Sequence, residues 1–177
     1  AVPFCRPSDL EADGLAGLYA RIITALAQKA HDLPMVLSGH LHVAGGEVSE
    51  LSERRLVIGG EEAAATDLFD PRAAYVALGH LHRPQTLNAA MPIRYAGSPF
   101  PLSATERAYR HSVTLAILET TGTILDILPI PRPVAFLRIP EQGALPLEDA
   151  VKAIQALDLP DLPRRLRPFI EIAILVD

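Results

Sequence analysis

The sequence predicts an α/β fold in which one helix precedes a series of short strands and a β-α-β unit follows them. Three observations support this prediction. Apolar residues recur at helical spacing between residues 15 and 30, and compact or alternating apolar runs follow between residues 35 and 130. A proline cluster then precedes a strand-helix-strand pattern. A chain of 177 residues is long enough for one domain, or for one domain and part of another.

The first helix is expected over residues 9–29. Its apolar positions repeat every three or four residues, at Leu15, Leu18, Ile22, Leu26 and Ala30. Gly14 and Gly17 lower its helix propensity and permit close packing against a neighbour.

Two compact apolar runs, residues 35–38 and 75–78, are predicted to form buried strands that each end in a turn. The Gly-rich, charged stretch 44–55 between them is expected to be a loop near the site, and residues 55–59 a short strand. Further strands are predicted near residues 93–96, 112–118 and 124–130, with Thr121 and Gly122 as a hairpin turn. We expect these three strands to form a meander on one side of a sandwich.

A domain boundary is predicted at the prolines Pro129, Pro131 and Pro133, so the two units are residues 1–130 and 131–177. Beyond the boundary, residues 134–139 and 169–176 are predicted strands. Between them lies one apolar helix face, made by Leu147, Val151, Ile154 and Leu157. The last strand alternates apolar residues and would need a neighbour to cover them.

The tetrapeptide Gly-His-Leu-His occurs twice, at residues 39–42 and 79–82, and it contains four of the six histidines. Glycine lets the chain leave each strand at an angle that a residue with a Cβ would resist. Because side chains alternate along an extended backbone, His80 and His82 are expected to point the same way, with Leu81 packed beneath. Two such strand ends side by side would gather imidazoles, which commonly bind transition metals.

These histidines also have simpler interpretations. A histidine after a strand is more often a surface or hydrogen-bonded residue than a ligand, so the motif alone is weak. His31 and His111 have no metal-like neighbours and are expected to be surface or strand residues. A repeat of propeller blades is excluded, because the chain has no tryptophan and the sequence around the two copies does not repeat.

The surroundings of the second copy are more specific. Residues 75–85 (YVALGHLHRPQ) and 93–99 (IRYAGSP) resemble the SbcD family of bacterial double-strand DNA nucleases, which are calcineurin-like metallophosphoesterases. The resemblance extends upstream through residues 3–7, 38–40 and 48–50. Gly-His-x-His alone identifies only the superfamily, whereas the Arg-Pro-Gln and Gly-Ser-Pro extensions point to SbcD.

The resemblance implies an exo- and endonuclease that acts in DNA end processing and repair by two-metal hydrolysis of phosphodiester bonds. By motif position, His40 and His80 would bind one divalent metal ion and His82 the other, with manganese expected at both. Arg83, next to the ligand histidines, is the candidate for contacting a DNA phosphate. His42 departs from the single histidine usual at that turn and would be an extra ligand or a lid residue. An SbcC-type ATPase partner and a homodimeric parent enzyme are also implied.

The family's N-terminal metal-binding motifs are missing. Asp-x-His, Gly-Asp-x-x-Asp and Gly-Asn-His followed by Asp or Glu do not occur, and the single asparagine, Asn88, precedes Ala89. The chain is therefore expected to be the C-terminal part of the nuclease β-sandwich with a flanking helix, residues 1–130, followed by the start of the capping domain, residues 131–177. Alone it is expected to be inactive.

Composition agrees with a piece of a larger intracellular protein. The chain is 49% hydrophobic with a mean hydropathy of +0.22, yet it has no membrane-spanning run and no cationic leader, so the apolar content is assigned to the core. The single cysteine, Cys5, cannot form an internal disulfide, which suits the cytoplasm. A net charge of −5 argues mildly against strong, sequence-independent binding to DNA, although bound metals would add local positive charge.

Two other functions stay open at this point. One is a different metallophosphoesterase that acts on small phosphate esters, against which the Arg-Pro-Gln and Gly-Ser-Pro strings count. The other is a noncatalytic module that uses the fold for assembly or for positioning DNA.

Overall fold

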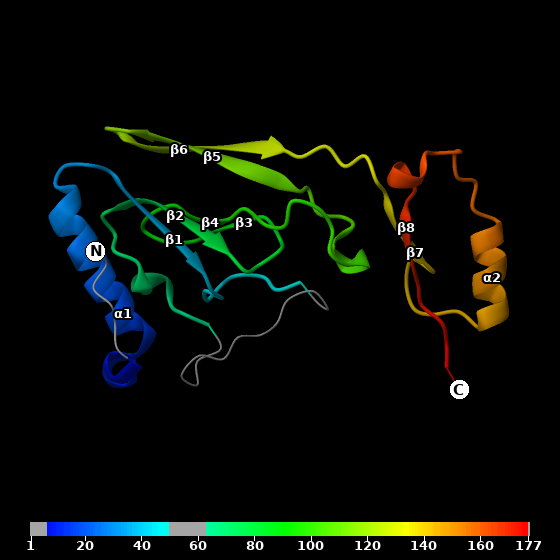
Figure 1. Cartoon of the computed structure of the whole chain (residues 1–177), viewed down its shortest axis with the longest axis horizontal. Helices are drawn as coiled ribbons and strands as arrows, with labels where there is room; N and C mark the ends of the chain where they lie inside the picture. The colour runs from blue at the N-terminus through cyan, green and yellow to red at the C-terminus, as the bar shows by residue number, and fades with distance from the viewer. Residues whose placement is uncertain (1–6, 50–62, 177) are drawn as a thin grey trace.

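The computed structural model describes residues 7–49 and 63–176 (Figure 1). The short strand expected at residues 55–59 lies outside these ranges. The helices and strands, in chain order, are α1 (Pro7–Ala30), β1 (Met35–His40), β2 (Ala73–Gly79), β3 (Gln85–Leu87), β4 (Ile93–Tyr95), β5 (Ser112–Glu119), β6 (Gly122–Pro129), β7 (Phe136–Ile139), α2 (Leu147–Gln155) and β8 (Phe169–Ile172). The predicted α/β class is confirmed.

A four-stranded sheet with the order β1-β2-β4-β3 forms the centre of the larger part of the molecule. Strands β1 and β2 are parallel, as are β2 and β4, whereas β3 runs antiparallel to β4. Because β1 and β2 are parallel neighbours, their C-terminal ends meet at one edge, with His40 opposite Gly79. The pairing therefore brings the two Gly-His-Leu-His segments together.

Helix α1 covers one face of this sheet. Its Ile23 is buried among apolar residues of β1, β2 and β4, and the Tyr19 ring meets the Phe69 ring edge to face with centroids 5.7 Å apart. The helix expected over residues 9–29 is confirmed, and it contains a kink. Gly14 has φ 59° and ψ −156° and kinks it, a conformation that glycine adopts because it has no Cβ.

The β5-β6 hairpin lies over the opposite face of the sheet (Figure 1). The Thr123 hydroxyl donates to the Ala74 carbonyl at 2.6 Å, and Arg94 Nε donates to Thr114 Oγ1 at 3.0 Å. Apart from Asp126, the hairpin's outer face is apolar and exposed, with Val113, Leu115, Ile117, Ile124 and Leu128 all more than 40% accessible.

The expected meander of residues 93–96 with the hairpin strands is wrong. Strand β4 instead inserts between β2 and β3 in the central sheet. All its residues, Ile93, Arg94 and Tyr95, are buried, which suits a strand covered on both faces rather than a member of an exposed hairpin layer.

The predicted β-α-β pattern is confirmed by β7, α2 and β8, which lie beyond one end of the hairpin (Figure 1). Strands β7 and β8 are parallel, and both are shorter than expected. Part of the last strand is exposed: the Phe169 side chain is 66% and the Ile172 side chain 43% accessible. Among the described residues, neither helix combines the length and apolar character that crossing a bilayer requires.

Candidate metal centre at the sheet edge

Three imidazoles gather where β1 and β2 end. The His40 and His80 rings meet edge to face with centroids 5.5 Å apart, and the His42 ring is 6.4 Å from that of His80. A metal lies about 2 Å from each ligating imidazole nitrogen, so the His40 and His80 rings are close enough to share an ion. The expected convergence of the two copies is therefore observed for these histidines.

The motif glycines allow close approach rather than a change of chain direction. Neither Gly39 nor Gly79 has a positive φ, and the left-handed residue at this edge is His80, with φ 98°. A Cβ at Gly79 would lie 2.8 Å from His40 Nδ1, and one at Gly39 would lie 2.7 Å from the Tyr19 hydroxyl. The expectation that glycine turns the chain is thus wrong. The unusual backbone falls on a candidate ligand, where strained conformations often occur.

His82 has an acidic partner, Glu106, from a different part of the chain. Strand β2 ends at Gly79 and His80 is left-handed, so the strand alternation expected to align His80 with His82 does not apply. His82 Nδ1 instead lies 2.8 Å from Glu106 Oε1, while Leu81 is buried beneath, as expected. In the part of the chain that the structure describes, no group of three or more histidine, cysteine or acidic side chains is arranged to hold a metal.

Glu106 is a site residue that the sequence did not reveal. Its side chain is fully buried, and Oε2 accepts hydrogen bonds from the Ser98 hydroxyl at 3.1 Å and the Leu102 N–H at 3.0 Å. A carboxylate that accepts from Nδ1–H leaves Nε2 available, and this is a common way to orient a metal-binding histidine. No periodicity or motif marks this glutamate, because only the fold buries it.

The Gly-Ser-Pro string packs directly against His82. Gly97 has φ 82°, and a Cβ there would lie 2.6 Å from the His82 carbonyl oxygen. The Ser98 N–H donates to the same carbonyl at 2.9 Å. Residues 97–98 therefore hold the His82 main chain directly and its imidazole through Glu106.

The Arg-Pro-Gln string ties the loop that carries Glu47 to the second copy. Gln85 Oε1 accepts from the Glu47 N–H at 2.7 Å, and Gln85 Nε2 donates to the Glu47 carbonyl at 2.9 Å. Arg83, the predicted phosphate contact, pairs with the Glu47 carboxylate and lies 6.0 Å from the centroid of the Tyr109 ring. Both partners of this pair are largely exposed, so the pair contributes little and a phosphate could replace the carboxylate.

His111 differs from its expected surface or strand position. It is 5% exposed and precedes β5, because the start of the hairpin folds back onto the Ser98 turn. His111 Nδ1 donates to the Ser98 carbonyl at 2.8 Å, while its Nε2 is buried without a hydrogen-bond partner in the described structure. His31 is exposed, as expected.

No family model matches the chain, but several known proteins are similar to it. The SbcD subunit of nuclease SbcCD from Rhodobacter capsulatus is 43% identical over 191 residues, covering 100% of this chain and 47% of the relative. The Escherichia coli K12 protein of that name is 33% identical over 157 residues, covering 77% and 39%. The Bacillus subtilis one is 45% identical over 85 residues, covering 48% and 22%. The chain thus spans less than half the length of these relatives, and it is a homologue of the SbcD subunit of nuclease SbcCD.

Proposed function

We propose that this chain is part of an SbcD-type DNA nuclease that hydrolyses phosphodiester bonds with two metal ions in DNA end processing and repair. Its homology along the whole chain supports the proposal. The observation that carries it is the arrangement at the sheet edge. There His40 and His80 lie ring to ring, and His82 is oriented by the buried Glu106.

His40 and His80 would hold one ion and His82 the second, with manganese as the metal. His82 fits this role, because an imidazole whose other nitrogen is hydrogen-bonded is a common transition-metal ligand, and His40 and His80 offer the same donor type. The bound ions would supply a hydroxide and neutralise the scissile phosphate. Glu106 would fix the His82 ring, and Gly79 would leave room for that of His40. The remaining ligands would come from residues N-terminal to Ala1.

The rest of the chain has assigned parts in this proposal. Residues 1–130 would complete the nuclease β-sandwich, and residues 131–177 would begin a capping domain over the site. Arg83 would exchange Glu47 for a DNA phosphate. The complete protein would form a homodimer, join an SbcC-type ATPase and act in the cytoplasm.

The test compares the 177-residue chain with a longer protein that carries the residues preceding it. With manganese and linear duplex DNA, we expect no degradation by the chain alone and degradation by the longer protein. His82→Ala in the longer protein should abolish activity, whereas His31→Ala, an exposed histidine outside the cluster, should not. Robust activity of the chain alone, or full activity of the His82→Ala protein, would contradict the proposal. Hydrolysis of a small phosphate ester in place of DNA would instead favour the other metallophosphoesterase class.

A further inference from the structure

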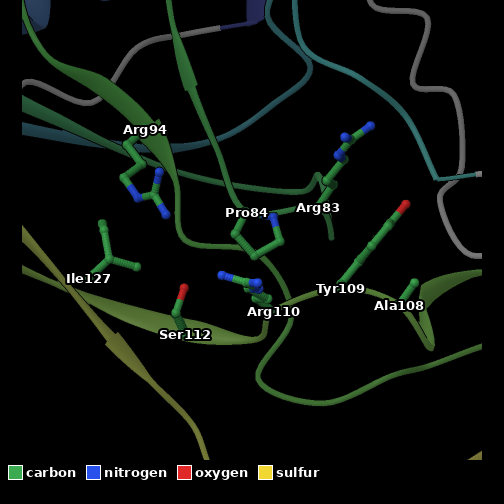
Figure 2. Close-up of a pocket in the computed structure, with 8 residues that line it drawn as sticks. All are labelled: Arg83, Pro84, Arg94, Ala108, Tyr109, Arg110, Ser112 and Ile127. Atoms are coloured by element: carbon green, nitrogen blue, oxygen red, sulfur yellow. The ribbon is translucent and has the colours of Figure 1, made fainter.

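A pocket of about 290 Å³ opens between β4, the Arg83-Pro84 turn and the start of β5 (Figure 2). Arg83, Arg94 and Arg110 line it, together with Ser112, and none of its lining residues is acidic. It contains no histidine, so it is distinct from the imidazole cluster. Arg83 is paired with Glu47, so Arg94 and Arg110 are the pocket's two positive charges without an acidic partner among the described residues.

Arg94 carries a buried charge that no carboxylate balances within the described ranges. It is 8% exposed, and its hydrogen-bond acceptors there are neutral hydroxyls, Thr114 at 3.0 Å and Thr86 at 2.9 Å. Burial raises the pKa of the Tyr75 phenol although Arg94 is near, so Tyr75 stays neutral and supplies no negative charge. A guanidinium does not lose its proton in a protein, and a buried charge without a counter-ion is costly.

Ser112 is a second, independent indication of a ligand. It is 4% exposed, and its hydroxyl has no hydrogen-bond partner in the described structure. It lies two residues before Thr114 on β5, so both side chains point to the face that carries Arg94. A buried hydroxyl without a partner is uncommon and indicates a missing acceptor.

The side chains of Arg94 on β4 and of Arg110 and Ser112 at the start of β5 point into the same space, whereas Arg83 points away from it (Figure 2). Arg110 is exposed, and it forms no ion pair with any residue that the structure describes. The pocket therefore presents one buried guanidinium, one accessible guanidinium and one hydroxyl donor.

We propose that this pocket binds a phosphate group, either free or within an ester, through Arg94, Arg110 and Ser112. Guanidinium groups match phosphate oxygens with paired hydrogen bonds, and donors that converge from several directions suit a tetrahedral anion. The pocket also leaves room for the group to which the phosphate is attached. This binding requires no metal, so it can be tested independently of the nuclease proposal.

The test is a metal-free NMR titration of the ¹⁵N-labelled 177-residue chain with inorganic phosphate. We expect saturable shifts of the Arg94 Nε–H and the Ser112 amide. Ser112→Ala should weaken binding about fivefold, as loss of one hydrogen bond does. Arg110→Gln should weaken it about tenfold, as loss of a charged donor does. Arg165→Gln, an exposed arginine outside the pocket, is the matched control and should change nothing.

Further arms identify the class and source of the ligand. Acetate should not compete at equal concentration, because a planar carboxylate reaches fewer of the donors. A single-stranded oligonucleotide that displaces phosphate would identify a nucleic-acid backbone as the source, whereas no displacement would identify a free phosphate or a small ester. Shifts that do not saturate, a Ser112→Ala chain that binds as well as the parent, or acetate binding as tight as phosphate would overturn the proposal. The Ser112 and Arg110 variants keep the test independent of whether substitutions at the buried Arg94 fold.

Discussion

The two Gly-His-Leu-His segments have the same sequence but are held in place by different interactions. The first, residues 39–42, is held through its main chain. The Tyr95 hydroxyl donates to the Leu41 carbonyl at 2.7 Å and accepts from the Val43 N–H at 2.9 Å. The second, residues 79–82, is also held through a side chain, because the buried Glu106 carboxylate meets the His82 ring.

This difference shows that an identical motif can present its imidazoles with different degrees of preorganisation. A ring hydrogen-bonded to a fully buried carboxylate has one preferred orientation, whereas His40 is exposed at the end of its strand. Ordering an exposed side chain costs conformational entropy when it binds. We therefore expect His82 to be prearranged for a ligand and His40 to become ordered on binding.

The largest effect should come from Glu106→Ala. The substitution removes the carboxylate that accepts from the Ser98 hydroxyl and the Leu102 N–H and that meets His82 Nδ1. We expect the free energy of unfolding in urea, followed by circular dichroism, to fall by about 3 kcal/mol. Glu119→Ala, at an exposed glutamate of β5, is the control and should change it by less than about 0.5 kcal/mol. Equal stabilities of the two variants would show that Glu106 does not anchor the second copy.

Gly97→Ala should have the next largest effect. The alanine would have to adopt a left-handed backbone conformation, and its Cβ would lie only 2.6 Å from the His82 carbonyl oxygen. Gly45→Ala is the matched comparison, because Gly45 also has a positive φ but nothing lies within 4 Å of its Cβ position. We expect losses of about 2 kcal/mol at Gly97 and about 1 kcal/mol at Gly45 in the same urea experiment. Equal losses of stability in the two variants would mean that the Gly-Ser-Pro turn is not closely packed against the second copy.

Tyr95→Phe should loosen the main chain of the first Gly-His-Leu-His segment without affecting the second. It removes the hydroxyl that bridges Leu41 and Val43, at a cost of about 1–2 kcal/mol for a buried pair of hydrogen bonds. Histidine ring resonances in NMR spectra should shift for His40 and His42 and stay in place for His82. Larger shifts at His82 than at His42 would show that the two copies are not held independently.

The smallest effect on stability should come from His40→Ala. The side chain is exposed, so we expect a change of less than about 0.5 kcal/mol. His82→Ala should cost about 1–2 kcal/mol, since it removes one of the donors to a buried carboxylate. Thermal unfolding of both variants at one pH measures the contrast. A His40→Ala chain less stable than the His82→Ala chain would reverse the comparison between the copies.

Much of the local structure could be predicted from the sequence. The apolar spacing located both helices, the compact runs located β1 and β2, and the last strand-helix-strand pattern became the parallel β7-α2-β8 unit. The repeated motif also predicted that imidazoles would converge, because parallel neighbouring strands end at the same edge of a sheet. These features depend on periodicity and turn chemistry, which a short stretch of chain carries by itself.

Other features were decided only by the tertiary structure. Strand β4 is too short for its pattern to choose between the hairpin and the central sheet, and burial on both faces decided this. Glu106 meets His82 across 24 residues of sequence, and Tyr95 reaches Leu41 across 54. The charge of Arg94 and the hydroxyl of Ser112 face one pocket only because the hairpin folds over the sheet. A polar side chain acquires such a role from partners brought together by folding, so its own neighbours in the sequence do not reveal that role.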